Sequence, residues 1–167
     1  MALTKLNFTG QGVLPATSMP SKSVLQVIST TKTDAITPIT STSFIDISGL
    51  TLDITPSSAT SKVFITVNFS TSNSGTSSLN VFNLVRGSTN ISQPDTTPTY
   101  NGSFGNYHAV ADNIMPTSFT FLDNPQTTSA TTYKLQMRTN AGTVTINRRN
   151  STDAAFTATF TLMEIKG

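Results

Sequence analysis

Apolar and polar residues alternate with a period of two through most of the chain after residue 22. The alternation is clearest at Val63-Ile65-Val67, at Leu79-Val81 and at Tyr133-Leu135-Met137. A period of two is the spacing of a β-strand with one buried face, and no segment shows the 3.6-residue spacing of an amphipathic helix. The pattern predicts strands over residues 23–30, 42–47, 50–55, 61–70, 78–87, 117–123, 131–139, 143–147 and 155–165.

Clusters of Ser, Thr, Asn, Gly and Pro separate the expected strands, as in TPSSATS, NSGTSS and DNPQTTSA. Short strands separated by such turn signals are typical of sandwiches and barrels. We therefore predict an all-β fold, an antiparallel β-sandwich of jelly-roll type with about 8 to 9 strands, over residues 23–167. A small β-barrel is the alternative architecture.

Residues 1–22 lack this alternation and are expected to form an extended N-terminal arm. Two glycines and two prolines interrupt any long element in this range. An arm that carries spaced apolar residues is ordered by packing on its own domain, on a sister subunit or on a partner, and we favour the last two. The candidate anchoring residues are Leu3, Leu6, Phe8, Val13 and Leu14.

The composition of the chain indicates which kinds of partner it binds. Ser and Thr are abundant, whereas charged residues make up only 11% of the chain, so few charges are left to guard exposed sheet edges. Closed homo-oligomerisation would cover those edges. The net charge is +2, and the pair Arg148-Arg149 lacks interleaved aromatic residues, so we expect no nucleic-acid binding. The chain has no cysteine, no apolar stretch long enough to span a bilayer and no signal-peptide pattern at its start.

No arrangement of residues indicates catalysis. His108 is the only histidine, it lies four residues from Asp112, and no G-x-S-x-G elbow accompanies it. One histidine without cysteine cannot build the common zinc sites. We predict no enzyme, no cofactor and no metal site. A structural calcium site assembled in space from loop carboxylates stays open, with the candidates Asp95, Asp112, Asp123 and Asp153.

Residues 88–114 form the longest stretch without a clean strand pattern, and a long loop in a compact domain is usually functional or mobile. Its mixture of Tyr, Ser, Gly and Asn is typical of binding loops. The candidate contacts to a receptor or glycan are Tyr100, Asn101, Phe104, Asn106, Tyr107 and His108. The alternative interpretation is that Phe104 and one tyrosine plug the end of the sandwich or a subunit interface.

Five phrases carry a family resemblance: SVLQVISTTKTD, TSFIDISGLTLDITPSSATSKVFI, LVRGSTNI, SFTFLDNPQTTSATTYKLQMRTNAGTVTINRRN and FTLMEIKG. In this order and spacing, residues 12–167 resemble domains of marine bacteriophage and cyanophage tail-fibre or virion structural proteins. The resemblance implies a trimeric module on the surface of the phage particle, made in the host cytoplasm, and it brings no catalytic residues. Residues 93–114 depart from the pattern, as expected of a loop that varies with its target.

Many relatives carry this domain behind a long shaft, whereas here it follows a short arm. The leading hypothesis is therefore a fibre or tip module that its N-terminal arm docks on another virion protein, in the tail or the capsid. The 88–114 loop would then face a host surface glycan or protein. The alternative is a capsid decoration (cement or head-fibre) protein without a receptor role. A third hypothesis is a depolymerase, although nothing in the sequence supports catalysis.

Overall fold

The computed structural model describes residue 15 and residues 18–96, 98–151 and 153–167. The five candidate anchoring residues, Leu3, Leu6, Phe8, Val13 and Leu14, lie outside the described residues. The described part contains eleven strands: β1 (Val24–Lys32), β2 (Ile36–Ile39), β3 (Ile45–Ile54), β4 (Lys62–Asn73), β5 (Ser78–Arg86), β6 (Thr89–Ile91), β7 (Phe104–His108), β8 (Ile114–Asp123), β9 (Thr131–Thr139), β10 (Val144–Ile146) and β11 (Ala158–Ile165).

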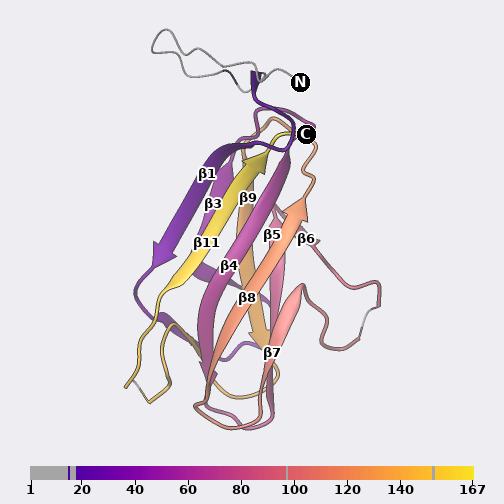
Figure 1. The fold of residues 1–167 in the computed structure, drawn as a ribbon. Coiled ribbons are helices and arrows are strands. Elements are labelled where there is room, and N and C mark those ends of the chain that lie inside the picture. Colours follow the sequence, from indigo (N-terminus) through magenta and orange to yellow (C-terminus); the bar gives the residue numbers. More distant parts are fainter. Residues whose placement is uncertain (1–14, 16–17, 97, 152) are drawn as a thin grey trace, which may run out of the picture.

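The strands form two antiparallel sheets, which confirms the predicted all-β sandwich. One sheet has the order β1-β11-β4-β10-β2, with β8 paired to β4. The other has the order β3-β9-β5-β6, with β7 paired to β5. The principal strands thus run β1-β11-β4-β8 in one layer and β3-β9-β5-β7 in the other, which is the strand order of a jelly roll (Figure 1). The sheets stay separate, in contrast to the alternative single barrel.

Alternating side chains build the core between the sheets. The inward positions of β9, β11 and the first part of β4 are buried, and their outward neighbours are more exposed, whereas residues 69–73 at the end of β4 are all buried. Burying one face of each strand supplies the main driving force for packing the two layers. The largest fully buried side chains include Tyr133, Phe82, Phe160, Leu135 and Leu162.

The sequence pattern is wrong about strand number at residues 42–55. The two strands expected there are the single strand β3, whose register against β9 shifts between Asp46 and Thr51. Gly49 lies within this irregularity with φ of +83°, a conformation that glycine adopts without steric cost. The shift allows both Ile47 and Leu50 to point into the core, although they are three residues apart.

The expected loop over residues 88–114 is also corrected, because it contains two strands. Thr89–Ile91 pairs with the end of β5 as β6, and Phe104–His108 pairs with the start of β5 as β7. These strands are short, and glycine and asparagine interrupt their apolar alternation. Pairing with the central strand β5 compensates for that weak local preference.

The two ends of the sandwich differ. At one end, called the arm end, the segment that precedes β1 lies beyond the strands, and the start of β1 lies beside the C-terminal residues (Figure 1). There the Lys22 amide donates to the Lys166 carbonyl at 2.9 Å. The opposite end, called the far end, contains the β4–β5 turn (residues 74–77) and the β7–β8 turn (residues 109–113). Within the described residues, no helix is long and apolar enough to cross a membrane.

Candidate contact surfaces

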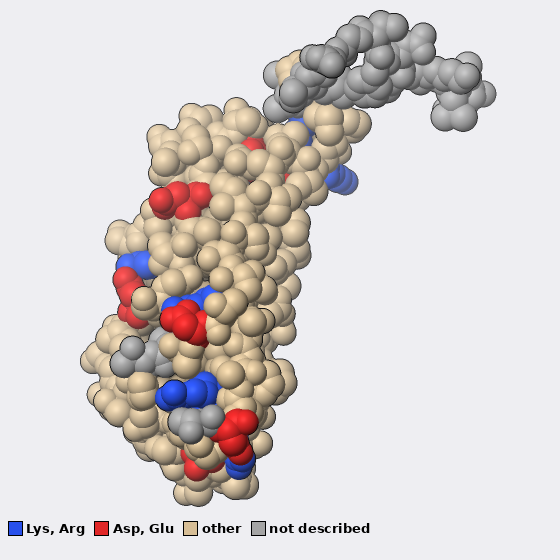
Figure 2. All heavy atoms as spheres, turned by 90° about the vertical axis from the view of Figure 1, so that its left-hand side faces the viewer, with Lys and Arg blue, Asp and Glu red and all other residues tan. Residues whose placement is uncertain are grey.

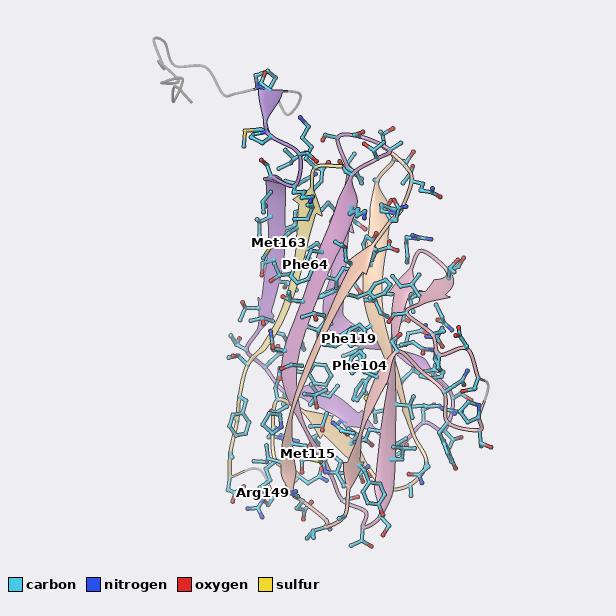
Figure 3. The ribbon with its side chains drawn as sticks, turned by 45° about the vertical axis from the view of Figure 1, so that its right-hand side comes forward. Phe64, Phe104, Met115, Phe119, Arg149 and Met163 are labelled. Carbon is cyan, nitrogen blue, oxygen red and sulfur yellow. The ribbon has the colours of Figure 1, made fainter. Side chains whose placement is uncertain are left out.

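Phe104, a predicted receptor contact, is partly buried and packs against the core. Its ring stacks on Phe82 at 5.0 Å between centroids and on Phe119 at 4.5 Å. Phe119 belongs to β8 of the first sheet, so the stack joins the two layers between β7 and β8, and Figure 3 shows the two rings facing each other. A ring stacked on two others in this way offers less surface to a receptor, and a receptor role for Phe104 stays a prediction.

Asn106 and His108 also point inward, into a polar network at the far end. The Asn106 amide donates to Thr71 Oγ1 at 2.8 Å and to Thr117 Oγ1 at 2.7 Å. Thr71 Oγ1 lies 3.1 Å from Nε2 of His108, whose side chain is fully buried. A fully buried imidazole cannot touch a surface partner. His108 is therefore removed from the contact surface, and Asn106 is committed to internal hydrogen bonds.

Two further asparagines extend the same network across the interior. Asn80 Nδ2 donates to Asn106 Oδ1 at 3.0 Å, and Asn73 Nδ2 donates to Asn80 Oδ1 at 3.0 Å. Asn73 Nδ2 also reaches Thr139 Oγ1 and the Ala141 carbonyl, at 3.2 and 3.1 Å. Buried polar groups are costly unless they are paired, so this chain of amides fixes the far end in one arrangement.

Burial lowers the pKa of His108 below its ordinary value of 6.5, and a backbone interaction with Asn113 opposes part of that shift. Burial has this effect because the imidazolium loses its hydration, whereas the neutral ring does not. The folded chain therefore holds His108 neutral at pH values where the unfolded chain has begun to protonate it.

Acidification is expected to destabilise the fold through this residue. Below about pH 6.5 the unfolded state binds a proton that the folded state takes up only at lower pH, so the free energy of unfolding falls, by at most about 1.4 kcal/mol per pH unit. Urea titrations between pH 7.5 and 5 measure this slope. Because His108 is the only histidine, H108Q is expected to flatten the curve in this window. An unchanged slope in H108Q would contradict the assignment.

Tyr100 and Tyr107 remain available to a partner. Their side chains are 46% and 52% exposed, and Asn101 is partly buried. Arg138 lies between Tyr100 and Phe44, with its guanidinium carbon 5.2 Å and 5.1 Å from the two ring centroids. Such cation–π contacts hold one face of Tyr100 against the protein and leave the other side to solvent. The receptor role of Tyr100, Asn101 and Tyr107 stays a prediction.

The loop between β6 and β7 is fastened to the outer face of the second sheet. Ser103 Oγ donates to the Ile91 carbonyl at 2.8 Å and accepts from the Leu84 amide at 2.9 Å. At Gly102 an added Cβ would lie 2.4 Å from a methyl carbon of Val81, so the backbone there sits directly on that side chain. Arg138 also donates to the Thr99 carbonyl. The two ends of the predicted variable loop thus pack on their own sheet, whereas residues 94–96 and 98–100 are exposed.

A row of apolar side chains crosses the outer face of the first sheet near the arm end. The strand register places Val27 opposite Met163, Met163 opposite Phe64, and Phe64 opposite Leu122. Val27 and Leu122 are 56% and 48% exposed, and the central two are partly exposed. Figure 3 shows Phe64 and Met163 side by side. With strands about 4.8 Å apart, this apolar row is roughly 15 Å wide.

The apolar row borders a groove of about 560 Å³. Phe64, Leu122 and Ile165 supply its apolar surface, and Ser21, Lys22, Lys62, Lys166 and Gly167 complete the lining. Sequence reasoning missed this surface, although VFI, FLD and LMEI place an apolar residue at the outward position of a strand. An outward apolar residue in three adjacent strands is the signal that could have revealed it.

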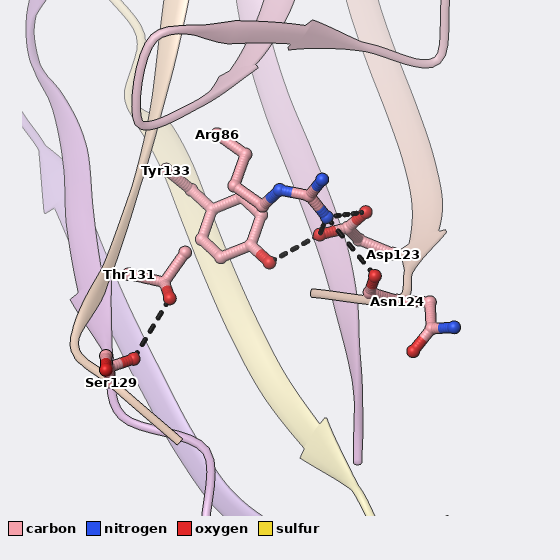
Figure 4. A network of polar contacts seen from close by, with 6 residues as sticks. All are labelled: Arg86, Asp123, Asn124, Ser129, Thr131 and Tyr133. Carbon is pink, nitrogen blue, oxygen red and sulfur yellow. Dashed lines mark hydrogen bonds and ion pairs between the residues drawn. The ribbon is translucent and has the colours of Figure 1, made fainter. Parts of the chain in front are cut away.

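The predicted calcium candidates do not converge. Asp123 is buried, and Arg86 Nη1 donates to both of its carboxylate oxygens, at 2.8 and 2.9 Å. The Tyr133 hydroxyl donates to the same carboxylate at 2.6 Å (Figure 4). Burial, and then the Asp123 carboxylate, raises the pKa of Tyr133. Asp153 pairs with Arg149 at 2.9 Å. Among the described residues, no group of three or more His, Cys, Asp or Glu side chains is placed to hold a metal ion.

The second buried acid, Glu164, is held separately at the arm end. Burial would raise its pKa, but hydrogen bonds from Ser57 and Gln26 outweigh burial and lower it. Charges elsewhere form small separate groups on a mostly uncharged surface, as the face in Figure 2 shows. A surface of this kind offers no stripe of positive charge to nucleic acid on that face.

No protein-family model matches the chain, and a search of curated proteins finds no match either. Among solved structures, one chain in the structure of infectious bursal disease virus Gx strain superposes with a TM-score of 0.43 at 14% sequence identity. That match covers 95% of this chain and 42% of the viral chain. At this level of similarity it carries no inference about function.

Proposed function

We propose that this chain is a structural module of a bacteriophage virion, docked on the particle at its arm end. The proposal joins the phage-protein phrases of the sequence with a jelly-roll sandwich, an architecture that viral capsid domains share with lectins and cupins. Since a fold does not by itself assign a function, the fold serves here as an analogy only. A virion location follows from the same proposal.

The proposal that the chain docks on the particle at its arm end rests on the distribution of exposed apolar side chains. Val24, Val27 and Leu122 lie exposed near the arm end, and Phe64 and Met163 lie between the last two. Contiguous exposed apolar patches mark interaction sites in soluble proteins. Docking at this end directs the far end of the sandwich away from the particle (Figure 1).

Deletion of residues 1–14 tests docking, because it leaves the contacts of residues 19–23 with β11 in place. Phage carrying the truncated chain are expected to lose the protein from purified particles, as measured by immunogold labelling and by mass spectrometry of the virions. Circular dichroism of the isolated truncated domain is the control for folding. Normal incorporation of a folded, truncated chain would contradict docking through this segment.

The finer proposal assigns a receptor contact to Tyr100 and Tyr107. The double variant Y100A/Y107A is expected to lower host adsorption at least tenfold while the particles keep normal amounts of the protein. The matched control is T96A/T99A in the same loop. Unchanged adsorption would contradict the receptor role and leave the virion role intact.

The second candidate function is a capsid decoration protein without a receptor role. It is favoured by the inward positions of Phe104, Asn106 and His108, which leave fewer of the candidate side chains free for a receptor. Gold particles over the head, together with heat-sensitive heads in phage lacking the protein, would support decoration. Gold particles along the tail would support the fibre or tip role.

A further inference from the structure

We infer that the groove beside the apolar row binds the N-terminal segment, residues 1–14, of a second copy of this chain. The groove lies on an outer sheet face, where Phe64, Leu122 and Ile165 present apolar surface beside the lysine stems. The stems of the exposed Lys22 and Lys62 add apolar contact while their ammonium groups reach solvent. Lys166 Nζ instead donates to the Met19 carbonyl. The surface therefore suits a largely apolar segment without acidic or basic residues on the side that faces the groove.

The sequence of residues 1–14 has that character. In MALTKLNFTGQGVL, Leu6 and Phe8 are two residues apart, and the only charged side chain is Lys5. In an extended chain Leu6 and Phe8 share one face, and Lys5 points to the other. When Leu6 and Phe8 face the groove, Lys5 is thus directed away from the rim lysines. An extended stretch of about five residues is enough to cross the roughly 15 Å of the apolar row.

The length of residues 1–14 allows them to reach a second copy of the domain. Residues 19–23 are fixed to the end of β11, with hydrogen bonds from Lys22 to Lys166 and from Lys166 to Ser23, both at 2.9 Å. The segment that precedes β1 continues beyond the strand ends (Figure 1), and its Ser21 and Lys22 lie at the groove. Fourteen extended residues span up to about 46 Å, which is ample to reach a neighbouring domain. Exchange of this kind would also hold together copies that carry few surface charges.

Because the chain has no cysteine, engineered pairs give a clean test. One preparation carries L122C, and a second carries L6C with a mass tag. Leu122 is exposed on the edge strand β8, so its substitution is expected to leave folding intact. After the two preparations are mixed, allowed to exchange and oxidised, a disulfide-linked species containing one chain of each kind is expected. The control replaces L122C by V110C, at an exposed site in the far-end turn.

The inference is overturned if the mixed L122C and L6C chains cross-link no faster than the V110C control. A third preparation carries L6C and L122C in one chain. The inference is also overturned if a disulfide forms only within that chain, since the segment then occupies the groove of its own domain. Sedimentation velocity supplies an independent measurement: the full chain is expected to form oligomers that L122D dissociates and V110D does not. A full chain that stays monomeric at high concentration would overturn it as well. These assays use purified protein, so they fail or succeed independently of particle docking.

Discussion

Replacing Asp123 with alanine is expected to lower the free energy of unfolding by about 3 kcal/mol. The substitution leaves the Arg86 guanidinium and the Tyr133 hydroxyl without their shared acceptor, and Tyr133 is fully buried. Removing one partner of a buried ion pair costs more than the pair itself contributes, because the remaining charge stays desolvated. At about 2–4 °C per kcal/mol, the melting temperature should fall by roughly 6–12 °C.

D46A is the matched control for D123A. Asp46 also forms an ion pair with a distance of 2.8 Å, to Lys134, but on the outer face and half exposed to solvent. Exposed pairs contribute about 0.5 kcal/mol, so D46A should be nearly neutral. Equal losses in the two variants, measured by urea denaturation, would show that the Arg86–Asp123–Tyr133 network does not tie β8 to the second sheet.

Replacing Asn73 with alanine is expected to cost about 3 kcal/mol as well. The Asn73 side chain donates to Asn80 and to the Ala141 carbonyl, and its Oδ1 accepts from the Gly75 amide at 2.8 Å. Each buried polar group left without a partner costs about 1–3 kcal/mol. N68A, on the solvent face of the same strand, is the matched control and should cost less than about 1 kcal/mol.

N73D separates hydrogen bonding from volume. Aspartate has the shape of asparagine, but its carboxylate cannot donate to Asn80 or to Ala141. We expect N73D to be at least as destabilising as N73A, with faster amide exchange in the β4–β5 turn. If N73D were close to wild type while N73A was not, the loss in N73A would come from the cavity alone, and the network would not be what fixes the far end.

Much of the fold could be predicted from the sequence because it depends on local alternation. Residues 61–70 and 131–139 each bury every second side chain, and a period of two predicts a strand with a buried face wherever it is placed. The β6 and β7 strands escaped prediction because β5, distant from β7 in the chain, supplies their hydrogen-bond partners. The sequence pattern predicted two strands within residues 42–55, where there is one, because Gly49 interrupts the two-residue alternation inside β3.

For the candidate contact residues, too, the sequence indicates the residue types, and the tertiary structure decides which of them are exposed. Residue types alone marked Tyr100, Tyr107 and His108 as alike, since aromatic and polar side chains in a glycine-rich stretch favour contact with a partner. Only the pairing of β7 with β5 decides that Tyr107 faces solvent while His108 is buried, because neighbouring side chains on a strand point to opposite faces. The apolar row likewise exists only in the tertiary structure. The sequence determined which residues share one face of each strand, whereas the antiparallel register of β1, β11, β4 and β8 brought four distant apolar residues together.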